Sequence, residues 1–134
     1  MAALDAEHSA CAFALQKLAQ SPTCDSIRRV IDLYSAHFDH EQELLDGFLY
    51  SENAKAEKSL TSFNAEALAR RSHFADHERM LDELREQLLS LTKTGGVAPA
   101  SFVDDVLRSF ERHANNYDMA YADRLSSELG KVSA

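Results

Sequence analysis

Residues 27–48, IRRVIDLYSAHFDHEQELLDGF, decide the fold of this chain. Their apolar residues recur mostly at intervals of three, four and seven positions, which keeps one face of an α-helix apolar. Those residues are Ile27, Val30, Ile31, Tyr34, Phe38, Leu45 and Phe48. Within the same stretch, HFDHE at 37–41 places His37 and Glu41 four residues apart, so their side chains share a helix face. We therefore expect an amphipathic helix that carries a histidine and a carboxylate together.

Three more segments have helical character. Strong helix formers dominate the first of them, and apolar residues at helical spacing mark the other two. The segments cover residues 4–19, about 65–91 and 99–129. SPT at 21–23 and KTGG at 93–96 separate the helices, and the glycines of KTGG can take a positive φ. Thr23 or Asp25 is the expected N-cap of the second helix, and Pro99 opens the fourth.

Four amphipathic helices with short connections favour an all-α fold, an up-down-up-down four-helix bundle. No alternating strand pattern competes with this prediction. The 134 residues are close to the commonest domain size, so residues 1–134 are interpreted as one domain. The polar stretch 51–66 fits a loop, a short extra helix or an extension of its neighbours.

Composition excludes several classes of partner. The chain has 14 Lys and Arg against 22 Asp and Glu, a net charge of −8 that would repel nucleic acid. No apolar run is long enough to span a membrane, and the N-terminus lacks the pattern of a signal peptide. Cys11 and Cys24 have neither metal-site nor disulfide-framework spacing, which favours packing roles in a reducing compartment. We expect a soluble, cytoplasmic protein.

Five of the six histidines and two carboxylates can be placed on the inward sides of the four helices. They are His8, His37, Glu41, His73, His77, His113 and Asp118. A lone histidine on an apolar face is usually a packed residue, and HFADH at 73–77 lacks the HExxH pattern of zinc proteases. Seven nitrogen and oxygen donors from four helices nevertheless predict a metal site in the core. Structural zinc needs about four ligands, whereas this set suits two six-coordinate ions bridged by carboxylates, and two irons fit it best.

One spacing in this set is irregular. His113 and Asp118 are five residues apart, so on a regular α-helix they would point about 140° away from each other. A π-type turn at 113–118 would realign them, and such turns occur often at functional sites. We therefore predict either a π-type turn there or a site broad enough to be reached from both directions.

The four motifs, in this order, resemble those of the bacterial hemerythrin-like proteins. The matching stretches are LDAEH at 4–8, HFDHE at 37–41, HFADH at 73–77 and HANNYDMAY at 113–121. The resemblance implies that His73, His77 and His113 hold one iron while His8 and His37 hold the other. It further implies that Glu41 and Asp118 bridge both irons beside an oxo or hydroxo bridge. One position on the iron bound by His8 and His37 stays open, where O2 would bind reversibly as hydroperoxide.

The sequence departs from the family in three respects. It contains no tryptophan, so the Trp-bearing N-terminal arm usual in the family is not expected to cover the site. The interval between His37 and His73 is longer than in compact bacterial members, with the surplus in the polar stretch after Tyr50. Ala114 follows the fourth-helix histidine where the family often has a branched apolar residue. We expect Ala114, Phe38 and Tyr117 to line a ligand pocket that is more open than usual.

Other polar residues receive simpler interpretations. His40 lies off the line of the ligands on its helix and is interpreted as a surface histidine. Arg70 and Arg71 fit a solvated helix face, and Asp76 fits a spare carboxylate on that face.

The resemblance implies a protein that is not an enzyme and that serves O2 or redox sensing, storage or delivery, with dioxygen or small anions as its ligands. Similar bacterial domains are often fused to signalling output modules, so this chain is either a whole protein or the sensory part of a longer one. The alternative is a di-iron enzyme that acts on nitric oxide or peroxide or repairs iron centres. Relatives of that kind have HxxxE on the fourth helix, which counts against this alternative. A purely structural metal or interaction bundle is the third hypothesis.

Overall fold

The computed structural model describes residues 2–50 and 65–118, and every helix in these two ranges belongs to one bundle. The elements are α1 (Ala2–Gln20), α2 (Cys24–Phe48), α4 (Ala65–Thr94), α5 (Ala100–His113) and a π-helical segment, η1 (Ala114–Asp118). No strand occurs in the described ranges. Most of the polar stretch 51–66, and the part of the predicted fourth helix beyond residue 118, lie outside them.

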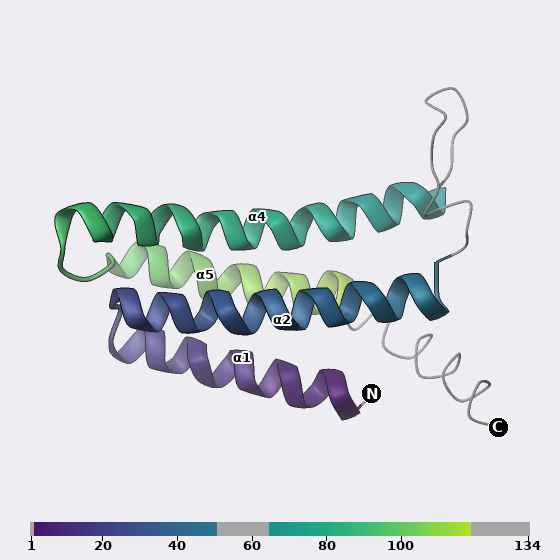
Figure 1. The fold of residues 1–134 in the computed structure, drawn as a ribbon, viewed down its shortest axis with the longest axis horizontal. Coiled ribbons are helices and arrows are strands. Elements are labelled where there is room, and N and C mark those ends of the chain that lie inside the picture. The colour runs from purple at the N-terminus through teal and green to yellow at the C-terminus, as the bar shows by residue number, and fades with distance from the viewer. Residues whose placement is uncertain (1, 51–64, 119–134) are drawn as a thin grey trace.

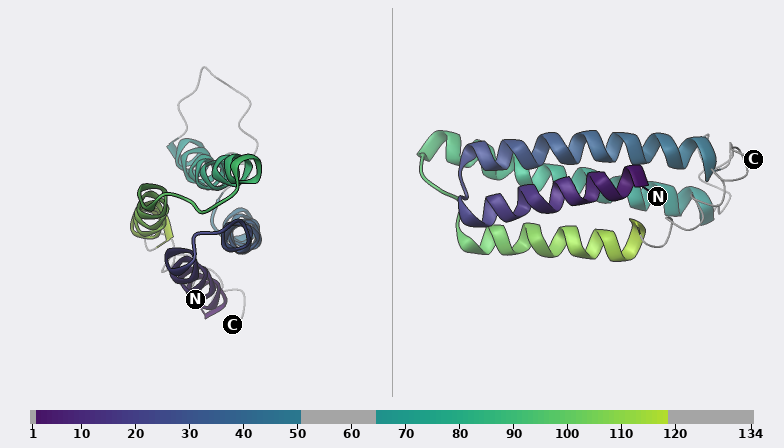
Figure 2. Two further views of the ribbon diagram at one scale, coloured as in Figure 1. Left: turned by 90° about the vertical axis from the view of Figure 1, so that its left-hand side faces the viewer. Right: turned by 90° about the horizontal axis from the view of Figure 1, so that it is seen from below.

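Successive helices run in opposite directions, so the bundle has the expected up-down-up-down order (Figure 1). Seen end on, the four helix axes occupy the corners of a square-like section in Figure 2. Around this section α1 contacts α2 and α5, and α4 contacts the same two helices. The prediction of an all-helical bundle is therefore confirmed for the described part of the chain.

The connections at one end of the bundle follow the expected cap chemistry. Thr23 is the N-cap of α2, and its side-chain oxygen accepts a hydrogen bond of 3.3 Å from the backbone N–H of Ser26. Gly95 and Gly96 follow α4 with φ angles of 74° and 87°, which favour glycine because it has no Cβ. The backbone N–H of Ala98 donates to the carbonyl of Pro22 at 2.8 Å, so the two connections are joined to each other.

The apolar faces of the helices meet in one main core cluster and a smaller one. Leu18, Ile27 and Leu84 are fully buried in the main cluster, which includes residues of all four helices. The smaller cluster gathers around Leu45, toward the end of α2. Cys11 is buried in the main cluster and Cys24 packs against it, which agrees with the packing roles expected for both thiols.

The predicted π-type turn is present. The α-helical pattern of α5 ends at His113, and the next five residues, Ala114–Asp118, are π-helical. Because a π-helix closes its turn with an i→i+5 hydrogen bond, residues five apart lie about one turn above each other. The segment thereby relieves the angular mismatch between His113 and Asp118, although the side chain of Asp118 is outside the described part of the structure.

The solvated-face interpretation of Arg70 is wrong. Its guanidinium donates from Nε and Nη2 to both carboxylate oxygens of Asp46, at 2.7 and 2.8 Å, and lies 4.7 Å from the ring centroid of Phe74. A fork of two parallel hydrogen bonds to a carboxylate is the strong form of an Arg–Asp pair. Arg70 therefore clamps the first turns of α4 to the last turns of α2. Helical periodicity alone could not identify a partner on another helix.

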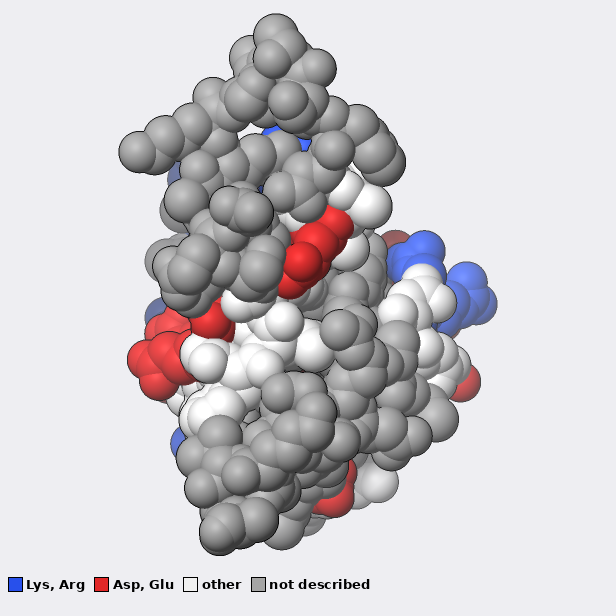
Figure 3. Space-filling view, turned by 90° about the vertical axis from the view of Figure 1, so that its right-hand side faces the viewer, with Lys and Arg blue, Asp and Glu red and all other residues white. Residues whose placement is uncertain are grey.

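Charged side chains of both signs surround the end of the bundle at which α2 ends and α4 begins. Figure 3 faces this end and shows acidic side chains near its centre and left, and basic ones mainly at its right.

No helix in the described ranges is long and apolar enough to cross a membrane.

The main core makes a direct prediction about stability. Leu84→Ala removes a fully buried side chain from α4 and should lower the free energy of unfolding by about 2 to 5 kcal/mol, because a cavity remains. Leu89→Ala is the matched control, since Leu89 is on the same helix and 59% exposed. Denaturant unfolding of both variants tests this, and equal effects would show that α4 does not pack as described.

Candidate metal centre

The fold brings six of the seven predicted ligand residues together in the half of the bundle that contains the N-termini of α1 and α4. Each of the four helices contributes. His8 comes from α1, His37 and Glu41 from α2, His73 and His77 from α4, and His113 from α5. The seventh, Asp118, is the last residue of η1, and its side chain lies outside the described part of the structure, so its ligand role stays a prediction.

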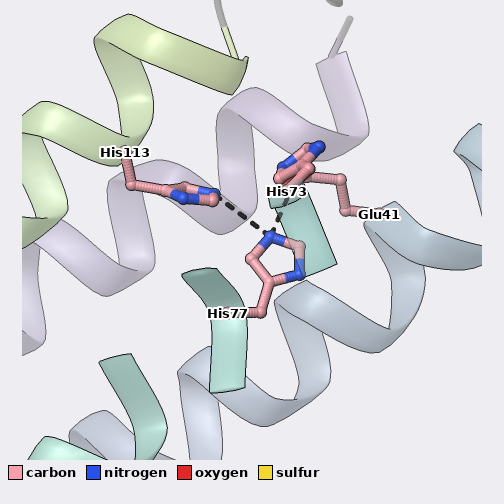
Figure 4. Close-up of side chains that lie close together, drawn as sticks. All are labelled: Glu41, His73, His77 and His113. Atoms are coloured by element: carbon pink, nitrogen blue, oxygen red, sulfur yellow. Dashed lines mark hydrogen bonds and ion pairs between the residues drawn. The ribbon is translucent and has the colours of Figure 1, made fainter. Parts of the chain in front are cut away.

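One group of donors consists of Glu41, His73, His77 and His113 (Figure 4). Their donor atoms all lie within 4.8 Å of one another. His73 Nε2 is 2.7 Å from Glu41 Oε1, and His77 Nε2 is 3.1 Å from His113 Nε2. Ligand atoms that share an ion with bonds of about 2.1 Å are about 3.0 to 3.4 Å apart, so the His77–His113 separation suits a common metal ion, whereas the His73–Glu41 separation is shorter and is that of a hydrogen bond.

A second group consists of His8, His37 and Glu41. His37 Nε2 lies 3.1 Å from Glu41 Oε2, and the rings of His8 and His37 meet edge to face with centroids 4.5 Å apart. Glu41 belongs to both groups and uses a different oxygen toward each of them. It is thus placed as a carboxylate would be if it bridged two ions.

Burial makes the surroundings of Glu41 unusual. Its side chain is only 4% exposed. Among the described residues, the side chains that contact its carboxylate are the histidines His37, His73 and His77. Burying an unpaired carboxylate is very unfavourable, and neutral imidazoles do not compensate its charge. If His77 and His113 both carry their proton on Nδ1, the form in which Nε2 binds a metal, the lone pairs of the two Nε2 atoms face each other at 3.1 Å, which is a second conflict. A bound cation resolves both conflicts, so the donor set fits a metal ion.

The protonation equilibria of the centre follow from this environment. Burial alone would raise the pKa of the Glu41 carboxyl, but hydrogen bonds from His37, His73 and His77 outweigh burial and hold that pKa well below its ordinary value. Burial lowers the pKa of His77, and Glu41 offsets this effect only in part. Glu41 is therefore a carboxylate and His77 a neutral imidazole near pH 7, the forms that bind metal.

Three polar side chains hold the outer nitrogens of the imidazoles. His37 Nδ1–H donates to Glu7 Oε1 at 2.8 Å, and His113 Nδ1–H donates to Asp76 Oδ2 at 2.7 Å. The amide of Gln42 lies 2.9 Å from His77 Nδ1, and a half-turn of that amide presents its oxygen to an Nδ1–H. Partners of this kind orient a ligand histidine and direct its Nε2 lone pair toward the metal.

These contacts correct two sequence-based interpretations and add residues that were missed. Asp76 is not a spare carboxylate, because it holds His113. His40 is off the ligand line as expected, yet it is half-buried and its Nδ1–H donates to Glu7 Oε2 at 2.6 Å. Glu7 and Gln42 were not predicted. Each is next to a ligand in sequence, but its partner is 30 or more residues away, and no local pattern reveals such a pair.

Aromatic rings shield the centre from the main core. Phe38 is buried and stacks on His77 with ring centroids 3.9 Å apart, and Tyr34 packs against Phe38 and Phe110. Phe38 lies on the apolar face predicted for its helix and is buried there, and Phe74 and Phe110 are half-buried. Ala114 is half-buried at the start of η1, and Tyr117 lies in η1 with its side chain outside the described part.

No protein-family model, curated protein or solved structure matches this chain.

The donor groups predict that metal stabilises the fold. With zinc or cobalt(II) at a free concentration about 100 times Kd, the free energy of unfolding should rise by about 2.7 kcal/mol for each site, because only the folded chain assembles the donors. Thermal unfolding with and without metal measures the effect. Glu41→Ala should lose most of it, whereas Glu43→Ala, at an exposed position of α2, should keep it. Equal stabilisation of both variants would contradict the site.

Proposed function

We propose that this chain is a hemerythrin-like, non-haem di-iron protein that binds O2 reversibly for sensing, storage or delivery. The observation that carries the proposal is the sharing of Glu41 by two donor groups, a buried one with three histidines and one with two histidines, of which His37 is buried and His8 half-buried. Two metal ions joined by a carboxylate are the simplest occupants of such an arrangement. The motif order in the sequence supports iron, because it resembles that of the hemerythrin-like proteins.

The residues assign distinct tasks to the two halves of the centre. His73, His77 and His113 would hold one iron, His8 and His37 the other, and Glu41 would bridge them, with Asp118 as the proposed second bridge. When bound, two ferrous ions supply two electrons to dioxygen and recover them when it leaves. The half with two histidines has fewer protein donors and is therefore the proposed position for O2. Neutral imidazoles, rather than a carboxylate-rich set, favour lower oxidation states and disfavour oxygenase chemistry.

The surrounding side chains would keep this chemistry reversible. The stacked rings of Phe38 and His77, with Tyr34 behind them, exclude water from the side of the main core. Glu7, Gln42 and Asp76 hold imidazoles from outside, so the donor atoms change little when the oxidation state changes.

Anaerobic reconstitution with ferrous iron tests the proposed function. We expect two irons per chain by metal analysis, and a visible charge-transfer band that appears on exposure to air and disappears when O2 is removed. Two irons with an oxidised spectrum that never reverses would favour the alternative of a redox sensor or a di-iron enzyme acting on nitric oxide or peroxide. Binding of one zinc and no iron would refute the proposal.

The small side chain after His113 leads to a second prediction. We expect Ala114→Ile to slow the autoxidation of the O2 complex several-fold, because a branched side chain at this half-buried position would narrow access for water and anions. The decay of the oxygenated absorption band in wild type and variant provides the measurement. Ala100→Ile, at the exposed start of α5, is the control and should leave the rate unchanged. An unchanged rate in Ala114→Ile would show that this residue does not limit the pocket.

A further inference from the structure

Glu7 joins two histidines of α2 to α1. Its Oε1 accepts from His37 and its Oε2 from His40, so both carboxylate oxygens are engaged. These are the side-chain hydrogen bonds of Glu7 among the described residues. Its side chain is 31% exposed and that of His40 is 36% exposed, whereas His37 is 2% exposed. The three residues thus form a chain of hydrogen bonds from the surface to the buried donor His37.

A similar chain reaches the other side of the centre. Asp76 accepts from His113 Nδ1 at 2.7 Å through Oδ2, and its Oδ1 accepts from Arg79 Nε at 2.9 Å. His113 is 2% exposed, Asp76 18% and Arg79 45%. In both chains a partly buried carboxylate holds one ligand histidine and is itself held by a more exposed donor.

We propose that Glu7 and Asp76 are positioning residues that each control one half of the metal centre. Glu7 serves the His8 half, which consists of His8, His37 and Glu41, and Asp76 serves the His113 half, which consists of Glu41, His73, His77 and His113. The inference rests on the proposed two-metal function, and it adds that Glu7 and Asp76 each position a ligand of a different metal site.

In each half, the carboxylate fixes the orientation and the protonated nitrogen of one imidazole ring. An imidazole whose Nδ1–H is donated to a carboxylate can present its Nε2 lone pair to a metal ion, and His37 Nε2 lies 3.1 Å from Glu41 Oε2, another donor of the same group. Without Glu7, the proton could move to Nε2 or the ring could rotate, and either change would remove a donor from the His8 half. That half has three described donors, so one loss should weaken its binding strongly.

His40 supports this role indirectly. A partly exposed glutamate has several rotamers and can turn toward water, so a single hydrogen bond would fix it poorly. The second bond, from His40 Nδ1–H at 2.6 Å, selects the rotamer in which Oε1 meets His37. His40 is not a donor in either metal group, yet its replacement should weaken the His8 half through Glu7.

Cobalt(II) titration tests whether Glu7 and Asp76 act on different metal sites, because the visible absorption of cobalt(II) reports coordination without any O2 chemistry. Wild type should bind two cobalt ions. Glu7→Ala should weaken one of the two sites about 10- to 100-fold and leave the other unchanged, and Asp76→Ala should do the opposite. His40→Asn should weaken the same site as Glu7→Ala, but less. Glu43→Ala, at an exposed glutamate of α2, should bind as wild type does.

A His8→Ala background assigns each effect to its half. That variant should keep only the site formed by Glu41 and the three histidines of the His113 half. Adding Glu7→Ala to it should then change nothing, whereas adding Asp76→Ala should weaken the remaining site about 10- to 100-fold. The proposal is overturned if Glu7→Ala binds both ions as wild type does, or if it weakens both sites equally while circular dichroism shows unchanged helix content.

A measurement on the metal-free chain separates this inference from the proposed function. Nitrogen-15 NMR of the imidazoles should show a proton on Nδ1 of His37 in wild type and partial loss of that Nδ1 proton in Glu7→Ala. If wild type binds fewer than two cobalt ions, the two-metal function fails, and an unchanged Nδ1 proton on His37 in Glu7→Ala would overturn the role of Glu7 as well.

Discussion

The described structure depends on one buried carboxylate, Glu41. It lies where helices from all four corners of the bundle bring histidines together, and its side chain is 4% exposed. A charge in this position must be compensated, because desolvation costs several kcal/mol and apolar neighbours offer no opposing interaction. The surrounding imidazoles can compensate it only by taking up protons or by sharing a cation. Five imidazoles lie close together, so protonating several of them at once is opposed by repulsion between their positive charges. A shared cation therefore compensates the carboxylate charge better.

The helices around Glu41 are arranged so that this cluster can form. The Thr23 cap begins α2 after the turn from α1, and the two glycines end α4 before the turn to α5, so each of these connections joins antiparallel neighbours. Donor atoms from α2 and α4 then lie within 4.8 Å of one another. The Arg70–Asp46 pair then holds the last turns of α2 and the first turns of α4 together. At the end of α5, η1 changes the angular spacing of the chain directly after His113. A regular α-helix there would satisfy the core but would turn Asp118 away from the line of His113.

Beyond the donor atoms lies a layer of polar residues that differ in exposure and charge. Glu7 and Asp76 are carboxylates and Gln42 is a neutral amide, so the three histidines that they hold are not equivalent. Burial opposes the carboxylate form of Glu7 and Asp76, but the hydrogen bonds from His37 and His40 to Glu7, and from His113 and Arg79 to Asp76, lower the pKa of both groups. Each is thus a charged acceptor near pH 7. Such outer partners account for much of the difference between metal sites with the same ligands.

The sequence by itself determined the helices, their order and the identity of the candidate donors, because these depend on local periodicity, on cap and turn residues, and on which side chains face inward. Even the π-type turn was one of two arrangements predicted from the five-residue spacing of His113 and Asp118. Only the tertiary structure decided that Glu41 faces both donor groups, that Glu7 and Asp76 hold His37 and His113, and that Arg70 pairs with Asp46. The contacts of Asp46, Glu7 and Asp76 with these partners join residues 24 to 37 positions apart, on different helices. Their partners depend on how the helices rotate and slide against each other as the core packs, and no pattern within a single helix contains that information.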